Sequence, residues 1–142
     1  MKKNKPMKLL VIYCTRFAYH PQIKTLENFP DYTEGKVFEN TLVAFIHAEE
    51  QDEEEMKKVE TKMVKNLKWA AKKNNITHVV LHSFAHLAET KATPQFTKEL
   101  FDKVEVRMKN ANYTCEQTPF GYFLDIDVQA PGVSQARIFK SF

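Results

Sequence analysis

The chain has 142 residues, 43% of them hydrophobic and 12% aromatic, which is enough for one sizeable core and short for two. Its formal charge of +3 comes from 21 basic and 18 acidic residues, a balance that permits contact with polyanions but lacks the basic excess of a dedicated nucleic-acid protein. Cys14 and Cys115 have no CxxC or metal-ligand spacing, which argues against a disulfide framework or a zinc site and favours a reducing cytoplasm. A basic tail, residues 1–6, precedes an apolar run too short to be a signal peptide or to span a membrane.

The first half of the chain predicts two strands and a less regular stretch between them. Residues 9–13 are a continuous apolar run, typical of a central strand that is covered on both faces. Residues 15–40 mix aromatic residues with Pro21, Pro30 and Gly35, which predicts an irregular excursion or a short helix. A second strand is expected at residues 41–48.

Residues 51–74 predict a helix. Apolar residues recur at steps of three and four, namely Met56, Val59, Met63, Leu67 and Ala70. Acidic residues 52–55 occupy the first turn, and Lys72 and Lys73 occupy the last, as the helix dipole favours. The dipole is a sufficient reason for these two lysines, and an RNA-binding patch is the alternative.

The second half of the chain alternates strands with one more helix. Strands are predicted at residues 76–82, 113–116 and 122–129, and a helix capped by Thr93 with Pro94 in its first turn extends to about residue 109. The element order predicts a single α/β domain with two main helices on a mixed sheet. Strands joined through a helix are expected to pair in parallel, and the last two strands to pair antiparallel through the turn at residues 119–121.

Three histidines, His78, His82 and His86, stand four residues apart. On a strand they would span about 26 Å, too far for one metal ion, so no metal site is predicted. His86 differs because it lies beyond the strand end, before the helix that starts at Pro94. There it can exchange hydrogen bonds with a ligand near neutral pH, and the alternative is a half-buried histidine bonded to the backbone.

Residues 119–121 predict a turn in which Gly121 lets a ligand approach the backbone. The rings of Tyr122 and Phe123 can stack on a nucleobase or, as is more common for aromatic residues after a turn, belong to the core. The sequence has no P-loop, GxGxxG, HExxH or Ser/His/Asp arrangement, which leaves nucleotide hydrolysis, hydride transfer and zinc protease chemistry without a residue basis. No cofactor is predicted.

Four segments, in order and at fitting separations, carry a resemblance to a known family. They are KLLVIYC (residues 8–14), TLVAFIHAEE (41–50), HSFAHLAE (82–89) and TPFGYF (118–123). Residues 7–142 resemble the amino-terminal editing domain of archaeal-type threonyl-tRNA synthetases, which has a D-aminoacyl-tRNA deacylase-like fold. The resemblance implies a homodimeric deacylase that removes a wrong amino acid, such as serine, from the 3′ end of threonine tRNA.

The resemblance also implies a set of site residues. His86 matches the family's histidine and is expected to be catalytic, and Tyr122 and Phe123 match the aromatic pair beside the terminal adenosine. Substrate-binding roles are expected for Ala48, Ala85, Phe120, Gly121, Tyr122, Phe123, Leu124 and Arg137.

Leu124 and Arg137 depart from the family, which usually has a lysine and a glutamate at these positions. Losing a charged donor leaves two hypotheses: a deacylase with an altered site, or a catalytically silent module that binds tRNA ends or a threonyl-tRNA synthetase. The chain is expected to be a free-standing relative or a fragment of a synthetase.

Overall fold

The computed structural model describes residues 5–142, so most of the predicted basic tail, residues 1–4, lies outside the described part. The described residues form six strands, two α-helices and two short 3-10 helices. In chain order these are β1 (Lys8–Lys24), β2 (Lys36–His47), η1 (Glu50–Glu55), α1 (Met56–Lys73), β3 (His78–Ser83), α2 (Pro94–Asn110), β4 (Thr114–Gln117), β5 (Tyr122–Gln129), η2 (Ser134–Ala136) and β6 (Arg137–Ser141). The predicted α/β fold with a mixed sheet and two main helices is confirmed.

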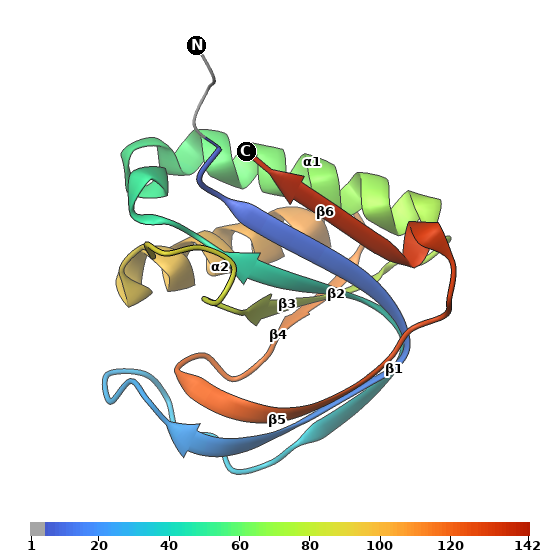
Figure 1. Cartoon of the computed structure of the whole chain (residues 1–142), viewed down its shortest axis with the longest axis horizontal. Coiled ribbons are helices and arrows are strands. Elements are labelled where there is room, and N and C mark those ends of the chain that lie inside the picture. Colours follow the sequence, from blue (N-terminus) through green and yellow to red (C-terminus); the bar gives the residue numbers. More distant parts are fainter. Residues whose placement is uncertain (1–4) are drawn as a thin grey trace.

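All strands join one sheet in the order β4-β3-β2-β1-β5, and β6 pairs with β1 as well. The β2–β3 and β3–β4 pairs are parallel, as expected for strands joined through helices, whereas β2, β5 and β6 all run antiparallel to β1. β5 and β6 share one edge of β1, with β6 beside its first residues and β5 beside its last. In Figure 1 the long, curved β1 therefore links the two ends of the sheet.

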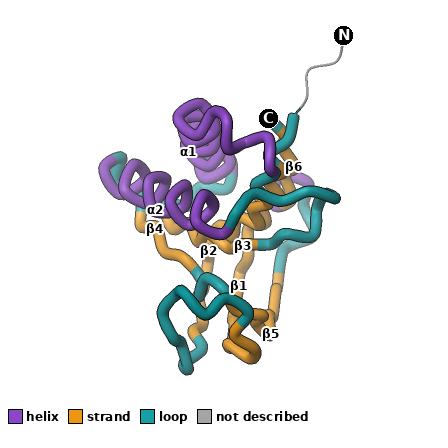
Figure 2. Tube along the Cα trace, turned by 90° about the vertical axis from the view of Figure 1, so that its left-hand side faces the viewer, coloured by secondary structure: helices purple, strands orange, loops and turns teal. Residues whose placement is uncertain are grey.

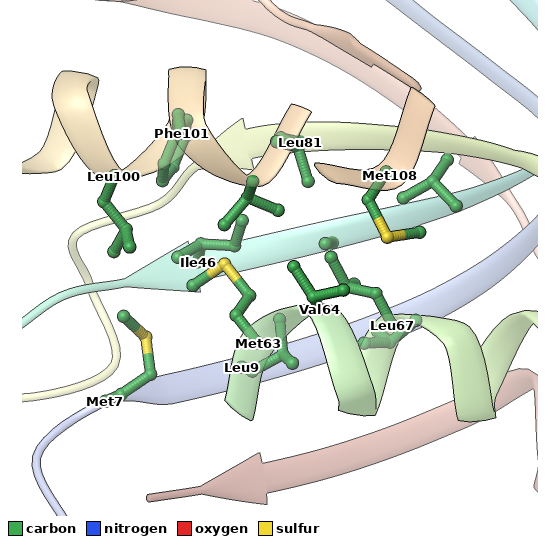
Figure 3. Close-up of a cluster of buried hydrophobic side chains, with 14 of the residues drawn as sticks. Met7, Leu9, Ile46, Met63, Val64, Leu67, Leu81, Leu100, Phe101 and Met108 are labelled. Carbon is green, nitrogen blue, oxygen red and sulfur yellow. The ribbon is translucent and has the colours of Figure 1, made fainter. Parts of the chain in front are cut away.

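Both helices lie on the same side of the sheet (Figure 2). Their apolar residues at three- and four-residue steps face the strands, and together they form the main core. Figure 3 shows this core, to which α1 contributes Met63, Val64 and Leu67, α2 contributes Leu100, Phe101 and Met108, and the strands contribute Leu9, Ile46 and Leu81. No described helix has both the length and the apolar character needed to cross a membrane.

The opposite face of the sheet holds a second, smaller buried cluster, made of Cys14, Phe17, Phe38, Val43, Phe45 and Val80. The ring of Phe17 lies edge-on to that of Phe45, with 6.5 Å between centroids. Since β1, β2 and β3 all contribute, this cluster fixes the strands that lead to the functional site from the side that the helices leave uncovered.

The stretch between the first two strands is more regular than the sequence predicted. Residues 15–24 continue β1 and residues 36–40 begin β2, so neither an irregular excursion nor a helix spans residues 15–40. Pro21 is tolerated because β1 pairs with β2 only as far as Tyr19, and the pairing with β5 has a register shift directly after Pro21. Similarly, residues 50–55 form a 3-10 helix before α1, not its first α-helical turns.

The predicted antiparallel pairing of the last two predicted strands is wrong. β4 pairs with β3 and β5 pairs with β1, so the turn at residues 119–121 carries the chain from one edge of the sheet to the other. The crossover through α2 returns the chain beside β3, which leaves β4 at an edge away from β5. A further strand that was not predicted, β6, then extends the sheet beside the start of β1.

Candidate functional site

A cleft of about 380 Å³ lies where the parallel strands β2 and β3 end, a size within the range of small-ligand sites. The ends of these strands, the segment after β3, the start of α2, the turn at residues 119–121 and the chain that follows β1 all contribute to its wall. The lining residues include Ile46, His47, Ala48, His82, Ser83, Ala85, His86, Lys91, Thr97 and residues 119–123. None of the lining residues carries a carboxylate, so the cleft is open to an anionic or ester ligand.

The turn before β5 is held from both sides. Gly121 has a φ of +84°, and a Cβ at this position would lie 3.0 Å from the Cβ of Leu26. The carbonyl oxygen of Gly121 accepts a hydrogen bond from the Thr25 N–H at 2.7 Å. Phe120 is buried, with its ring 4.9 Å from that of Phe29, so it supports the turn from below. A glycine is required here because the chain after β1 packs directly against the turn.

The two aromatic residues after the turn have different roles. The hydroxyl of Tyr122 accepts a hydrogen bond from the Tyr32 N–H at 2.9 Å, which fixes the ring at the cleft wall. Phe123 also lines the cleft but is 57% exposed, so its ring is available to a ligand. Of the two interpretations of this pair, a stacking surface suits Phe123, and a place in the core suits neither residue.

The segment after β3, which carries His86, is clamped by His47 at the end of β2. The Leu87 N–H donates to His47 Nδ1 at 2.9 Å, and His47 Nε2 lies 2.7 Å from the Thr90 carbonyl oxygen. Because Nδ1 accepts, Nε2 must carry the proton and donate, which fixes the neutral tautomer. His47 is 1% exposed and sits within a continuous apolar run, so no pattern in the sequence distinguished it.

His86 itself is exposed, and its imidazole has no hydrogen bond to any residue of the described part. Its ring lies 5.0 Å from that of Phe84, and its backbone N–H donates to the Phe84 carbonyl at 2.9 Å. The alternative considered for His86, a half-buried histidine bonded to the backbone, does not apply, because His86 is exposed and its imidazole is unbonded; the histidine that bonds the backbone is the buried His47. His86 therefore presents a free imidazole to the cleft.

His82 is a buried neutral histidine among the lining residues. Its Nδ1 lies 2.9 Å from the Thr118 hydroxyl, and its ring lies 5.2 Å from that of Phe45. Burial lowers the pKa of His82 from 6.5 to about 4, because the charged form would lose its hydration. His82 and Thr118 thus join β3 to the turn segment through one buried hydrogen bond.

The three evenly spaced histidines do not converge on a metal. The imidazole of His78 pairs with Glu116 at 2.8 Å, while His82 bonds Thr118 and His86 faces the cleft. Within residues 5–142, no group of three or more His, Cys, Asp or Glu side chains is placed to hold a metal ion. Burial raises the pKa of Cys14 to about 11 and that of Cys115 to about 12, so neither thiol is a nucleophile at neutral pH.

The structure brings together seven of the nine expected site residues: Ala48, Ala85, His86, Phe120, Gly121, Tyr122 and Phe123 line one cleft. Leu124 and Arg137 are not among its lining residues. Leu124 lies on β5 opposite Pro21, and Arg137 begins β6, where its Nη1 donates to the Pro131 carbonyl oxygen at 2.7 Å. The roles expected for all nine residues stay predictions.

Residues 7–142 match the family described as the archaea-specific editing domain of threonyl-tRNA synthetase. The chain is 29% identical over 127 residues to threonine–tRNA ligase of Methanococcus aeolicus, covering 89% of this chain and 20% of the relative. It is 27% identical over 138 residues to that of Pyrococcus horikoshii, covering 95% and 22%, and 30% identical over 119 residues to that of Methanopyrus kandleri, covering 82% and 19%. The chain thus spans about a fifth of the length of these relatives.

Among solved structures, the c-Myc DNA unwinding element binding protein has a similar fold, with a TM-score of 0.61 at 10% sequence identity. The match covers 94% of this chain and 97% of that one, so the similarity extends through the whole α/β domain. At this identity it supports the fold alone. The family match, in contrast, runs through every segment that builds the cleft, and the chain belongs to the archaea-specific editing domains of threonyl-tRNA synthetase.

Proposed function

We propose that this domain hydrolyses the ester bond between a wrongly attached amino acid and the 3′ end of a tRNA. The observation that carries the proposal is the meeting of His86, the small residues Ala48 and Ala85, and the exposed ring of Phe123 in one cleft. Phe123 is suited to stack on a terminal base, and the alanines leave room for a small aminoacyl group. Family membership supports tRNA editing as the general activity.

The proposed reaction needs no side-chain nucleophile. A water oxygen attacks the ester carbonyl carbon, the bond from that carbon to the ribose oxygen breaks, and the released oxygen takes up a proton. His86 offers an unbonded imidazole to position the water, and backbone N–H groups offer donors to the developing oxyanion. Ala85 and Gly121 line the cleft, and their N–H groups donate to no other group in the described part of the chain. A hydroxyl of the RNA itself can complete the site.

The preferred substrate is seryl-tRNA specific for threonine. Serine differs from threonine by one methyl group, and a hydrophobic contact of that size discriminates by only about 1 to 3 kcal/mol, which is why such errors call for editing. The cleft wall contains the small side chains of Ala48, Ala85 and Ala92. These walls suit a small aminoacyl group better than a large one.

A second function, a catalytically silent module that binds tRNA ends or a synthetase, is favoured by the two departures from the family. Leu124 stands where the family has a lysine, and the guanidinium of Arg137 is engaged with the Pro131 carbonyl oxygen. With those charges absent from the site, binding can persist without turnover.

The deciding experiment is a deacylation assay on a panel of mischarged tRNAs, including L-seryl-tRNA specific for threonine and several D-aminoacyl-tRNAs. We expect wild type to release serine fastest and His86→Ala to be slower by about 10²-fold or more, the usual contribution of a positioned acid-base group. His20→Ala is the matched control, because His20 is exposed but does not line the cleft. No turnover by wild type together with tRNA-end binding would establish the silent module, and equal loss in both histidine variants would refute the role of His86.

We further propose that the domain forms a homodimer through the edge of the sheet at β5 and β6. Large apolar side chains are exposed there, including Ile126, Val128 and Phe139. An apolar patch of this kind at a strand edge favours association with a second copy. Light scattering after size-exclusion chromatography should give twice the monomer mass at micromolar concentration, and a monomer alone would remove the claim.

The proposed setting is the cytoplasm, and the proposed binding partner is a threonyl-tRNA synthetase. Both cysteines are free and buried, which suits a reducing compartment. Similarity to one segment of several threonine–tRNA ligases supports the choice of partner. Co-purification of the tagged domain with the synthetase of the same cell would test it, and recovery of the domain alone would refute it.

A further inference from the structure

The side of α1 that faces away from the sheet is a continuous basic surface. Every lysine of the helix lies on it, and the set comprises Lys57, Lys58, Lys62, Lys65, Lys68, Lys72 and Lys73. The one acidic residue of α1, Glu60, is 5% exposed and faces inward, where it accepts a hydrogen bond from Arg107 at 3.0 Å. The outward face of α1, the helix along the top of Figure 1, is therefore free of carboxylates within α1.

This surface concentrates the charge of the whole protein. Seven lysines and one glutamate give α1 a formal charge of +6, whereas the complete chain has +3, so all other residues together carry −3. The helix dipole explains only Lys72 and Lys73, which lie in the last turn. The other five lysines lie in the first and middle turns, where the dipole gives no reason for a positive charge.

The lysines of the second helix, α2, are paired with carboxylates. On α2, Lys98, Lys103 and Lys109 each lie within 4.0 Å of a carboxylate one turn away, on Asp102, Glu99 and Glu105 respectively. On α1, one lysine of the described structure has an ion pair of this kind, Lys58 with Glu55 at 3.4 Å. The two helices have nearly equal lengths, but the lysines of α2 are paired and most of those of α1 are not, so of the two helices α1 offers the uncompensated cations to a partner.

The basic surface runs along the length of α1 and ends beside an aromatic ring. It starts at Lys57, after the acidic 3-10 helix η1 that separates α1 from the cleft residue Ala48, and extends for about 24 Å along the helix to Lys73. At that far end the half-exposed ring of Trp69 lies 5.2 Å from the ammonium of Lys73 and 4.7 Å from that of Lys140 on β6. The basic surface thus continues from the far end of α1 onto β6 of the sheet.

From this arrangement we propose that the outward face of α1 binds the sugar-phosphate backbone of an RNA duplex. Lysine side chains bind phosphates as point charges and read no bases, so the contact is independent of sequence. A row about 24 Å long can contact several consecutive phosphates. That this duplex is the acceptor stem of the tRNA whose end enters the cleft rests on the proposed function.

The test is the binding of a fluorescently labelled acceptor-stem minihelix that carries no amino acid, measured by fluorescence anisotropy from 50 to 300 mM KCl. The variant is Lys62→Gln/Lys65→Gln/Lys72→Gln, and the matched control is Lys98→Gln/Lys103→Gln/Lys109→Gln on α2. Both remove three charges from a helix and keep good helix formers, so both should retain the wild-type circular dichroism and melting temperature. Because both variants lose the same number of charges, a difference in their RNA affinity shows the effect of where the charges lie.

We expect the α1 variant to bind roughly tenfold more weakly at 100 mM KCl, and its salt slope, log K against log [KCl], to be shallower by about 2 to 3. The α2 variant should stay near wild type in both quantities. Equal slopes for the two variants would overturn the proposal, as would displacement of the minihelix by polyglutamate as effectively as by unlabelled duplex, which would indicate an acidic protein as the partner. Because the minihelix carries no amino acid, its binding does not depend on catalysis. Binding of the minihelix together with no turnover in the separate deacylation assay would contradict the proposed catalysis and leave the duplex surface standing.

Discussion

Replacing His82 with glutamine tests whether the buried imidazole beside the cleft makes the protein sensitive to acid. The pKa of His82 falls from 6.5 to about 4 on folding, because burial disfavours the charged ring. Between these two values the unfolded chain binds a proton that the folded protein does not. The stability contributed by neutral His82 is therefore complete above pH 6.5 and is lost as the pH falls toward 4.

The size of this effect follows from the shift. A difference of about 2.5 pKa units, from 6.5 to about 4, corresponds to about 3 kcal/mol of unfolding free energy between pH 7 and pH 4. Glutamine can still accept a hydrogen bond from the Thr118 hydroxyl but does not titrate. Urea denaturation of both proteins at intervals from pH 4 to pH 7.5 gives the difference in unfolding free energy at each pH, in which the contributions of all other groups cancel.

We expect wild type to lose about 3 kcal/mol relative to His82→Gln as the pH falls from 7 to 4. A difference that stays constant over this range would refute the reasoning, because it would mean that the imidazole is hydrated or protonated in the folded protein. His20→Gln is the control, since His20 is exposed on β1 and should leave the pH profile unchanged.

Three further predictions concern single contacts. Asp52→Asn should show the opposite pH effect, because burial raises the pKa of Asp52 from 3.8 to about 6, so its stabilising contribution is present below pH 3.8 and lost as the pH rises past 6. In the same urea series, wild type should lose about 2 kcal/mol of unfolding free energy relative to the variant between pH 4 and pH 7, and a constant difference would count against this reasoning. His47→Leu should lower the unfolding free energy by about 1 to 3 kcal/mol and speed hydrogen exchange of the Leu87 amide, because the Leu87 N–H and the Thr90 carbonyl oxygen lose their partner. Unchanged exchange would show that the clamp is unimportant. Gly121→Ala should destabilise the domain by about 1 to 3 kcal/mol in thermal melts, since a Cβ would meet Leu26 at 3.0 Å with φ at +84°, whereas Gly132→Ala, with open space around it, should not.

The elements that the sequence predicted well are those set by local chemistry. The Thr93 side chain accepts a hydrogen bond from the Phe96 N–H at 3.2 Å, as expected for a helix cap followed by proline. In α1, the apolar residues that recur every three or four positions match the buried ones, because one face of the helix packs on the sheet. In both cases the deciding residues lie within one or two turns of each other.

The elements that it predicted poorly depend on partners far along the chain. β5 pairs with β1 more than a hundred positions earlier, for example Gln129 with Arg16, and no local pattern distinguishes that pairing from a hairpin with β4. β1 continues through Pro21 because its pairing changes there from two neighbours to one. His47 shows the same limit at the site, since its role exists only once the segment after β3 folds back over the end of β2. The resemblance to a family located the cleft segments that composition and periodicity left open.

Leu124 offers a direct test of whether the missing charge limits catalysis. It follows Tyr122 on the same face of β5, about 7 Å along the strand, so a lysine there would place its ammonium within reach of the cleft that Tyr122 lines. Leu124→Lys should therefore raise kcat/KM for seryl-tRNA specific for threonine, by about tenfold or more if the ammonium stabilises the developing negative charge. Val106→Lys is the matched control: it adds the same charge at an exposed apolar position of α2, outside the cleft and away from the β5 and β6 edge, where it should affect RNA binding through net charge but not kcat. An equal gain in both variants would mean that added positive charge merely attracts tRNA, and no gain in either would mean that the leucine is not what limits the reaction.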